Sequence, residues 1–373
     1  MFGTTRRILG FGRVAESIIS FIMKRSEPIL MEFAMPTNRR MLLQTLASVP
    51  LWSAVGRGAH AQSATALREV ALISFGGGFN LPVWAAQEQG FFAAQGLAVQ
   101  HTITADSKQV FSGLMEGKYQ IAITALDNIL AYQEGQGELK LDPPSDFFGF
   151  MGSDDGFLSL VSAPEVKTFA DLRGKTVSVD AMSNGFSFAM REMMRRGGVT
   201  EADVQWARAG GTDRRFAALM EGQHAATMLR APFDIQAKNR GFNVLATTRE
   251  TIGPYLGIVG AARRSWAQSN QPVVVGFIRA YRDAIVWLKA SVNRPTAQAL
   301  LMRKVPAMTE AVAAQSCAML LDPKTGFYSD VALDEKAVQA VMDLRSKLGE
   351  GGRVLTDQSK YVDRRYWELA VRP

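Results

Sequence analysis

Short apolar runs alternate along the chain with longer segments in which apolar residues recur every three or four positions. The first such runs, which predict strands, lie at 70–74, 97–104 and 121–124. The spacing at 81–94 and at 107–117 predicts a helix between each pair of strands. A strand–helix–strand order of this kind favours a parallel sheet covered by helices.

A second series of strands and helices follows. Further strands are expected at 147–151, 158–161, 175–179, 204–207, 226–229, 243–246 and 256–261, with helices at 185–196, 212–221 and from 233. After residue 261 the pattern is almost entirely helical, at 272–290, 295–304, 309–320 and 334–348. The sequence therefore predicts an α/β protein with two α/β lobes and a helical C-terminal tail.

Two chain crossings, near residues 157 and 256, are expected to join the lobes. The first lobe is then discontinuous and takes 62–157 plus 257–373, and the second lobe takes 158–256. A cleft between two such lobes, lined by the ends of strands and the beginnings of helices, is a favoured place for a small ligand.

The front of the chain has the order of an export signal. Asn38-Arg39-Arg40 is a positive start, 42–55 is a mostly apolar run too short to span a membrane, and Ala59-His60-Ala61 offers a cleavage site. The competing interpretation, a first buried helix, fits poorly with Pro50, Gly56 and Gly58. We expect residues 35–61 to be cleaved and 1–34 to reflect a start placed too early, because Met35 itself begins a complete signal.

The stretch 37–44 resembles a twin-arginine signal, from which it departs at Asn38, Leu42 and Gln44, so Sec export remains open. No cysteine follows the cleavage site, which excludes a lipid anchor there, and no apolar run past residue 61 reaches spanning length. Cys317 is the only cysteine, so an intramolecular disulfide is excluded. We expect a free protein in the periplasm, and a monomer.

The net charge of +7 invites a nucleic-acid interpretation, but the leader carries most of it. Residues 1–61 contain eight of the 42 basic and three of the 35 acidic residues, which leaves 34 and 32 and a net charge of +2. That balance is too small for a surface that tracks phosphates. We therefore expect a small-molecule partner and no nucleic acid.

Three segments carry a likeness to a known family. The segment 82–97, PVWAAQEQGFFAAQGL, resembles the region after the first strand in nitrate/sulfonate/taurine-type binding proteins of ABC transporters, including the NMT1/THI5-like proteins. Gly113–Gly117 leading to Ile121–Thr124, and 169–179 (FADLRGKTVSV), resemble two further steps of that family. The likeness runs from about residue 70 to 363.

The resemblance implies a type II periplasmic-binding fold with a hinge, and an ABC permease in the inner membrane as partner. It implies binding and release without a cofactor or a bound metal. By the same resemblance, the turn Thr124, Ala125, Asp127 and Asn128 touches ligand, and the turn holding Arg230 and Pro232 faces the cleft.

Physical reasoning selects loops of the same kind. A helix N-terminus offers unpaired N–H groups and partial positive charge, which suits an anion. On this ground the candidate ligand residues are Gly77, Gly78, Phe79, Asn80, Ser183, Asn184, Gly185, Phe186 and Thr212. Several have structural alternatives: Asp127 and Ser183 as helix caps, Arg230 paired with Asp234, and Trp84 as a core residue. Arg214 and Arg215 are expected to be solvated, and Ser107 to cap its helix.

Two other functions stay open. One is an enzyme of the THI5-like pyrimidine-synthase type, against which stand the two histidines left after export, His101 and His224, neither at metal-ligand spacing. The other is a sensor, in which the ligand-bound form signals to a membrane regulator. Among ligands, a sulfonate, nitrate, aromatic carboxylate or pyrimidine fits, and we expect an organic anion.

Overall fold

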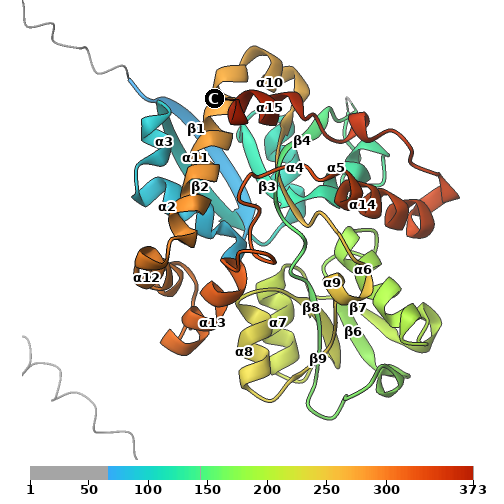
Figure 1. Ribbon diagram of the computed structural model, residues 1–373. Helices are drawn as coiled ribbons and strands as arrows, with labels where there is room; N and C mark the ends of the chain where they lie inside the picture. The colour runs from blue at the N-terminus through green and yellow to red at the C-terminus, as the bar shows by residue number, and fades with distance from the viewer. Residues whose placement is uncertain (1–65, 143, 373) are drawn as a thin grey trace, which may run out of the picture. The chain divides into compact units, whose positions relative to one another are not determined.

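Two five-stranded sheets organise the computed structural model, which describes residues 66–142 and 144–372 (Figure 1). Sheet A has the order β2-β1-β3-β10-β4, with β1 Arg68–Phe75, β2 Leu97–Thr104, β3 Ile121–Ala125, β4 Phe147–Asp154 and β10 Ile258–Arg263. Sheet B has the order β7-β6-β8-β5-β9, with β5 Ser159–Ser162, β6 Thr176–Val179, β7 Gln205–Arg208, β8 Ala226–Leu229 and β9 Asn243–Thr247. The predicted export signal and the early start lie outside the described residues.

The helices flank these sheets. Those on sheet A are α2 Leu81–Glu88, α3 Phe91–Ala94, α4 Ser107–Met115, α5 Leu126–Gln133 and, after β10, α10 Arg264–Ser269, α11 Gln271–Lys289, α12 Arg294–Lys304, α13 Glu310–Leu320, α14 Glu335–Leu348 and α15 Arg365–Val371. Those of sheet B are α6 Gly185–Arg196, α7 Thr212–Met220, α8 Phe233–Asn239 and α9 Thr248–Thr251. We call sheet A with its helices the first lobe, and sheet B with its helices the second lobe. The predicted α/β class, two lobes and helical C-terminal region are confirmed.

Each sheet contains one strand that runs against the others, which the expectation of parallel sheets missed. In sheet A it is β10, antiparallel to both β3 and β4, and in sheet B it is β5, antiparallel to β8 and β9. Both strands enter their sheet directly from the other lobe, so the chain arrives from the opposite end and runs the opposite way.

Two helix boundaries also differ from expectation. The expected helix at 81–94 is broken into α2 and α3 at Gly90, whose φ of 75° lies in the left-handed region. The cap of α4 is Asp106, whose carboxylate accepts from the backbone N–H of Lys108 at 2.9 Å, and Ser107 is the first helical residue. An aspartate one position earlier competes successfully with the serine for the same role.

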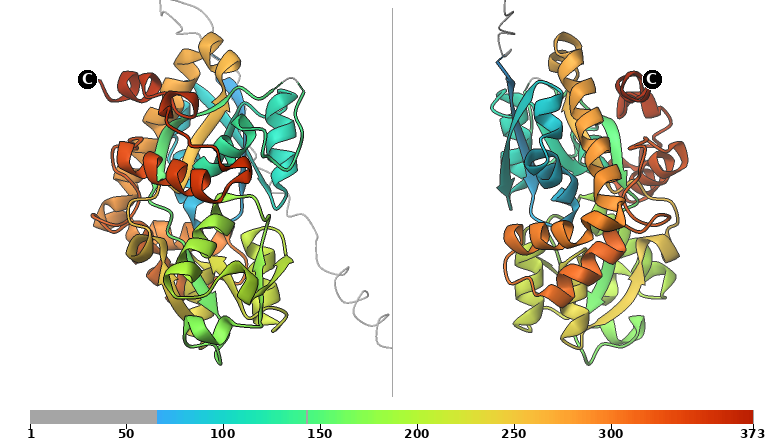
Figure 2. Two further views of the ribbon diagram at one scale, coloured as in Figure 1. Left: turned by 90° about the vertical axis from the view of Figure 1, so that its right-hand side faces the viewer. Right: turned by 60° about the vertical axis from the view of Figure 1, so that its left-hand side comes forward.

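Sheet A is buried on both faces, and its strands alternate between two cores. Leu72, Ile121 and Ile123 pack with α2 and α11 on one face, whereas Ile73 and Ala122 pack with α4, α5 and α14 on the other. Figure 2 shows α11 running the length of the sheet. On that face Phe277 of α11 is fully buried and stacks on Phe92 at 5.1 Å between ring centroids. This packing fixes the loops at the ends of the strands.

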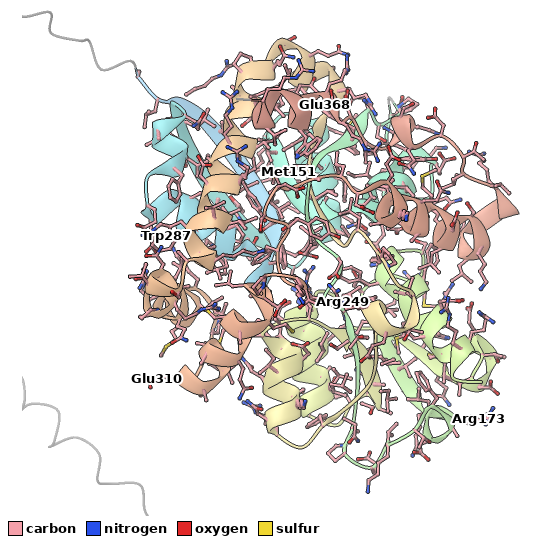
Figure 3. All side chains as sticks on the ribbon, viewed as in Figure 1. Met151, Arg173, Arg249, Trp287, Glu310 and Glu368 are labelled. Carbon is pink, nitrogen blue, oxygen red and sulfur yellow. The ribbon has the colours of Figure 1, made fainter. Side chains whose placement is uncertain are left out.

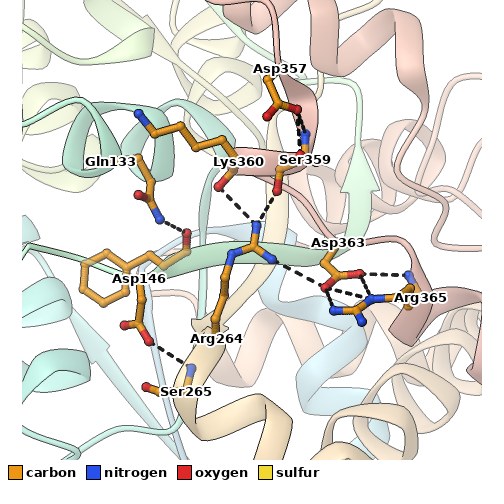
Figure 4. Close-up of polar contacts among 10 residues, drawn as sticks. Gln133, Asp146, Arg264, Ser265, Asp357, Ser359, Lys360, Asp363 and Arg365 are labelled. Carbon is orange, nitrogen blue, oxygen red and sulfur yellow. Dashed lines mark hydrogen bonds and ion pairs between the residues drawn. The ribbon is translucent and has the colours of Figure 1, made fainter.

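The C-terminal segment is tied to the edge of sheet A. Residues beyond α14 run beside β4, where the N–H of Gly149 donates to the carbonyl of Tyr361 at 2.8 Å. Arg264 donates to the carbonyls of Ser359 and Lys360 and to the carboxylate of Asp363, as Figure 4 shows. These bonds attach the end of the chain to the first lobe.

The two segments that cross between the lobes touch through glycine. A Cβ added to Gly257 would lie 2.3 Å from the Cα of Gly156, so Gly257 has no room for a side chain. Phe157, next to Gly156, has a φ of 38°, which is uncommon for a residue other than glycine. Arg249, labelled in Figure 3 at the level between the two sheets, pairs with Asp155 in the first crossing.

A buried polar network shapes the loop after β1. The hydroxyl of Ser74 has two acceptors within reach, Asn80 Oδ1 and the carbonyl of Phe75. The hydroxyl oxygen of Ser74 also lies 2.7 Å from His101 Nε2. Burial, together with Lys304, lowers the pKa of His101 to about 4. The imidazole is therefore neutral at physiological pH.

In the described part of the chain, no helix combines the length and the apolar character needed to cross a bilayer. The described residues form one compact unit.

Truncating the centre of the α11 contact should destabilise the protein strongly. Phe277→Ala is expected to lower the free energy of unfolding by about 3–5 kcal/mol, because a fully buried ring leaves a cavity. Val286→Ala on the same helix, where the side chain is 57% exposed, should change it by less than about 0.5 kcal/mol. Urea unfolding of both variants measures this, and equal losses would contradict the described packing.

The neutral state of His101 predicts a specific pH dependence. Since its folded pKa lies below the unfolded value, only the unfolded chain takes up the proton as the pH falls from about 7 to 4, and stability is lost there. His101→Gln keeps a hydrogen-bonding group beside Ser74 and should remove about 2–3 kcal/mol of that loss. Unfolding measured at several pH values tests it, with His224→Gln as the comparison; a curve unchanged by His101→Gln would show that another group is responsible.

Candidate ligand-binding site

A small pocket lies where loops of both lobes meet. Its wall is formed by Phe75, Phe79, Ala125, Asn128 and Ile258 from the first lobe and by Asp180, Asn184, Gly185, Phe186, Gly211, Thr212, Arg215 and Arg230 from the second. The free volume at its centre is small, about 30 Å³. Eight of the residues proposed from the sequence lie in this wall: Phe79, Ala125, Asn128, Asn184, Gly185, Phe186, Thr212 and Arg230.

The glycine-rich loop after β1 brings the first lobe against the second. The N–H of Gly78 donates to the carbonyl of Ala231 at 3.0 Å, and a Cβ on Gly78 would lie 3.1 Å from that oxygen. Glycine is needed here for the close approach of two backbones. Gly77 and Gly78 thus position the loop, and Pro232 belongs to the turn that they contact, but none of these three lines the pocket.

Phe79 and Arg230 form a stacked pair across the lobes. The guanidinium of Arg230 lies 4.5 Å from the centroid of the Phe79 ring, and both side chains are buried. Such stacking is favourable when the cation is desolvated. The ring and the guanidinium together form one side of the pocket.

Arg230 pairs with Asp154 at the end of β4. The sequence analysis had named Asp234 as its alternative partner. Its Nη2 lies 3.1 Å from Asp154 Oδ2, whereas Asp234 accepts from the hydroxyl of Ser159. Burial raises the pKa of Asp154, and the guanidinium opposes that rise. Nη1 of Arg230 is buried and has no hydrogen-bond partner within residues 66–142 and 144–372.

The beginning of α6 supplies the second wall. Asn184 caps the helix by accepting from the N–H of Ser187 at 2.9 Å, and Gly185 and Phe186 follow in its first turn. A Cβ on Gly185 would lie 2.4 Å from Cβ of Asp127 in the first lobe, so glycine allows the lobes to meet. Ser183, the strongest anion candidate from the sequence, lies beside a different, smaller cavity next to Gln136 and Glu138.

The beginning of α7 supplies the third wall and corrects one expectation. Arg215, expected to be solvated, is 2% exposed and lines the pocket, whereas Arg214 is exposed as expected. Its donors reach the carbonyls of Gly210 and Met228 and the hydroxyl of Thr212.

The charge of Arg215 is only partly matched. The nearest carboxylate oxygen, Asp180 Oδ1, lies 3.5 Å from Nη1, and Nε has no hydrogen-bond partner in the described chain. Burial lowers the pKa of Arg215, with Asp180 and Asp213 opposing, yet a guanidinium stays charged at neutral pH. The spacing Arg215, Ala218, Leu219 puts the arginine on the buried face of the helix, a signal that the sequence contained.

Three of the proposed ligand residues have structural partners instead. Asp127 was expected to cap α5 or touch ligand. Its Oδ1 accepts from Arg345 Nε at 2.7 Å and its Oδ2 from Arg345 Nη2 at 2.6 Å, and both side chains are 1% exposed. Thr124 is fully buried and accepts from the amide of Asn128 at 3.0 Å. Asn80 donates to the carbonyls of Phe75 and Gly77 and accepts from the hydroxyl of Ser74. The side-chain amide of Asn80 therefore stabilises the loop.

Arg345 itself bridges the lobes. Besides Asp127 it donates to the carbonyl of Ser183 at 2.8 Å, and its guanidinium lies 4.8 Å from the centroid of Phe188. Both Ser183 and Phe188 belong to the second lobe. The sequence analysis missed this residue, although Val338, Val341, Met342 and Arg345 form one helical face.

The pocket offers donors and aromatic surface and few groups suited to bond chemistry. Within the described ranges, no cluster of three or more His, Cys, Asp or Glu is arranged to hold a metal ion. Cys317 is buried in α13, and burial raises the pKa of its thiol to about 11. His101 Nε2 lies 2.7 Å from the hydroxyl oxygen of Ser74, and His101 does not line the pocket. The arrangement is suited to bind an anion with an apolar part.

Comparison with known proteins places the chain in a family. The family model "NMT1/THI5 like" matches residues 80–295, more than half of the chain, while no curated protein matches it in sequence.

Solved structures share the fold at low sequence identity. The periplasmic nitrate-binding protein NrtA from Synechocystis PCC 6803 superposes with a TM-score of 0.67 at 13% identity, over 82% of this chain and 88% of that one. The periplasmic aliphatic sulphonate-binding protein SsuA from Escherichia coli gives 0.62 at 16%, over 82% and 99%. The desulfurization enzyme DSZB gives 0.57 at 11%, over 81% and 99%.

The extent of the family match, the strand order 2-1-3-10-4 of sheet A and these superpositions agree. The chain belongs to the NMT1/THI5-like family, and its fold is the type II fold of the periplasmic binding proteins.

Proposed function

We propose that this protein is the periplasmic binding component of an ABC importer and that it holds a small organic anion between its lobes. The observation that carries the proposal is Arg215, a buried guanidinium that lines the pocket with an unused donor in the described chain. A charge held out of water is costly unless it is matched, so the site favours a ligand that brings a negative charge.

Other features of the pocket support an anion. The first turns of α6 and α7 both open onto it through Gly185 and Thr212, and backbone N–H groups at helix starts favour negative charge. Arg230 adds a second buried guanidinium. The rings of Phe75, Phe79 and Phe186 favour an organic group beside the charged one.

The proposed mechanism is closure without bond chemistry. Residues 62–157 plus 257–373 act as one rigid lobe and 158–256 as the other, and they turn about the crossings at Gly156 and Gly257. The ligand binds one lobe first, and closure adds the donors of the other. A permease in the inner membrane then recognises the closed form.

Location and partners follow from the same proposal. The leader 35–61 directs export by the Sec or the twin-arginine route, and the mature chain works in the periplasm as a monomer that carries a small molecule.

Catalysis is the alternative, because DSZB has the same fold. We favour binding because the titratable groups that line the pocket, Asp180, Arg215 and Arg230, do not form a nucleophile with an adjacent base. These three charged side chains are instead suited to bind a charged ligand.

Removing the guanidinium of Arg215 should weaken ligand binding. A thermal-shift screen of the purified chain against sulfonates, aromatic acids, pyrimidines and inorganic anions first identifies a ligand. Arg215→Met keeps most of the side-chain volume and should weaken that ligand by about 1–3 kcal/mol, roughly 5- to 150-fold, because a charge-assisted bond is lost. Arg214→Met, on the exposed neighbour, should leave the affinity unchanged in calorimetric titration; a screen whose hits are all cations would overturn the anion proposal.

A side chain at the contact between the lobes should prevent closure. Gly185→Ala puts a Cβ 2.4 Å from Asp127, so the lobes cannot meet fully, and affinity should fall about ten-fold or more. Small-angle X-ray scattering should show ligand-induced compaction in the wild-type protein and less in the variant. Gly149→Ala, where a Cβ meets its nearest neighbour at 3.5 Å, is the control. Full compaction in Gly185→Ala would remove closure at this contact from the mechanism.

A further inference from the structure

A helix of the first lobe, α14, packs directly against the second lobe. It lies beside α5 of the first lobe and α6 of the second (Figure 1). Val341 of α14 belongs to the same buried apolar cluster as Phe188 and Met193 of α6. The beginning of α14 is fixed at the second crossing, where the N–H of Leu256 donates to the carbonyl of Ala337 at 3.2 Å.

Two positive side chains near the end of α14 bond to the second lobe. Lys347 Nζ donates to Glu192 Oε2 of α6 at 2.7 Å, and Arg345 Nη2 donates to the carbonyl of Ser183, just before α6, at 2.8 Å. Ala337 and Lys347 lie ten positions apart in the helix, so these bonds lie about 15 Å along it from the crossing. A rotation about the crossings would therefore separate the bonded groups.

The first lobe matches its own buried charge at this contact. Asp127 and Gln136, both of the first lobe, accept three of the hydrogen bonds that Arg345 donates. The bond to Ser183 is the one that crosses to the second lobe. When the lobes separate, the guanidinium keeps its carboxylate and its amide oxygen, so its charge stays matched.

The second lobe does the same for Glu192. Its side chain is 5% exposed, and Arg195 and Arg196 of the same helix donate to it at 2.9 Å. Hydrogen bonds from Arg195 lower the pKa of Glu192 well below its usual range; burial opposes this, and Lys347 and Arg196 add to the lowering. When the lobes separate, Glu192 keeps its two arginines, and Lys347, whose side chain is already 46% exposed, returns to water.

These contacts are therefore suited to form and break repeatedly. A buried ion pair in which each member depends on the other resists separation, because separation leaves two unmatched charges. The bonds made by the end of α14 do not have that property, since each buried charge has partners within its own lobe.

The contact is also coupled to the anion pocket. Asp127 precedes Asn128 and Ser183 precedes Asn184, and both asparagines line the pocket. Arg345 thus ties together the two loops that carry them. A ligand that draws the same loops together favours the same closed form, so ligand binding and the α14 contact strengthen each other.

We propose that the end of α14 is a latch on the closed form. Lys347 and Arg345 are positioning residues that keep a fraction of the ligand-free protein closed and slow the release of a bound ligand. The latch rests on the closure mechanism proposed above. Neither residue lines the pocket, so the latch acts on the movement of the lobes and not on the ligand itself.

Distances between spin labels on the two lobes measure the closed fraction. Val292→Cys in the first lobe and Val244→Cys in the second place the labels at sites that are 81% and 39% exposed, and Cys317 is buried. Double electron–electron resonance on the ligand-free full chain should resolve an open and a closed distance. Lys347→Gln should lower the ratio of closed to open molecules about two- to five-fold, the effect of one partly exposed ion pair. Lys347→Glu, which puts a like charge beside Glu192, should lower it further.

Lys336→Gln is the matched control, because Lys336 is exposed in the first turn of the same helix. It should leave the ratio unchanged. Urea unfolding of Lys347→Gln close to that of the wild-type protein excludes a general loss of structure. A ratio that neither Lys347 variant changes, or a ligand-free protein found only in the open form, would overturn the latch.

The rate of release separates the latch from the proposed function. Stopped-flow measurement with the best anion of the screen should show dissociation about two- to five-fold faster from Lys347→Gln, and an unchanged rate would contradict a latch that slows release. If the Lys347 variants shift the ligand-free ratio and no anion binds, the closed-form latch stands and the anion proposal fails. If an anion binds and the ratio does not shift, only the latch is removed.

Discussion

Three buried arginine side chains at the junction of the lobes impose the constraint on which the other features depend. Arg215, Arg230 and Arg345 are each almost fully buried, and a guanidinium cannot shed its charge at neutral pH. Each must therefore find its partners inside the protein or in a bound ligand, because an unmatched buried charge is strongly destabilising. The loops around them are arranged to provide those partners.

The three arginines divide by how completely they are matched. Arg345 has a bidentate carboxylate in Asp127, the amide oxygen of Gln136 and a carbonyl, so its role is to hold the lobes together. Arg230 has one carboxylate and Arg215 a more distant one, and both retain a donor without a partner in the described residues. The incomplete pair, and not the complete one, lines the pocket. Under the proposed function, the fully matched arginine joins the lobes and the two incompletely matched arginines meet the ligand.

Local pattern predicted most elements of the fold, since the helix at 185–196 and the strands at 97–104 and 226–229 agree with α6, β2 and β8. Of these, β8 is buried throughout, which gives a continuous apolar run. Strand direction was not accessible in the same way, because β10 is antiparallel only as a result of its return from the other lobe. The loops of the pocket were found because helix starts are visible in sequence. The partner of Asp127 was not found, because Arg345 lies 218 residues away.

The position of β10 has a consequence for how the chain is made. This strand lies inside sheet A, between β3 and β4, yet it follows all five strands of sheet B in the sequence. When a ribosome has produced β1 to β4, the first sheet still lacks an inner strand and has an unpaired edge. It can be completed only after the entire second sheet has emerged, so the N-terminal lobe cannot finish folding ahead of the C-terminal part, as consecutive domains commonly do. Long-range pairing of this kind slows folding, so the newly synthesised chain stays incompletely folded for longer.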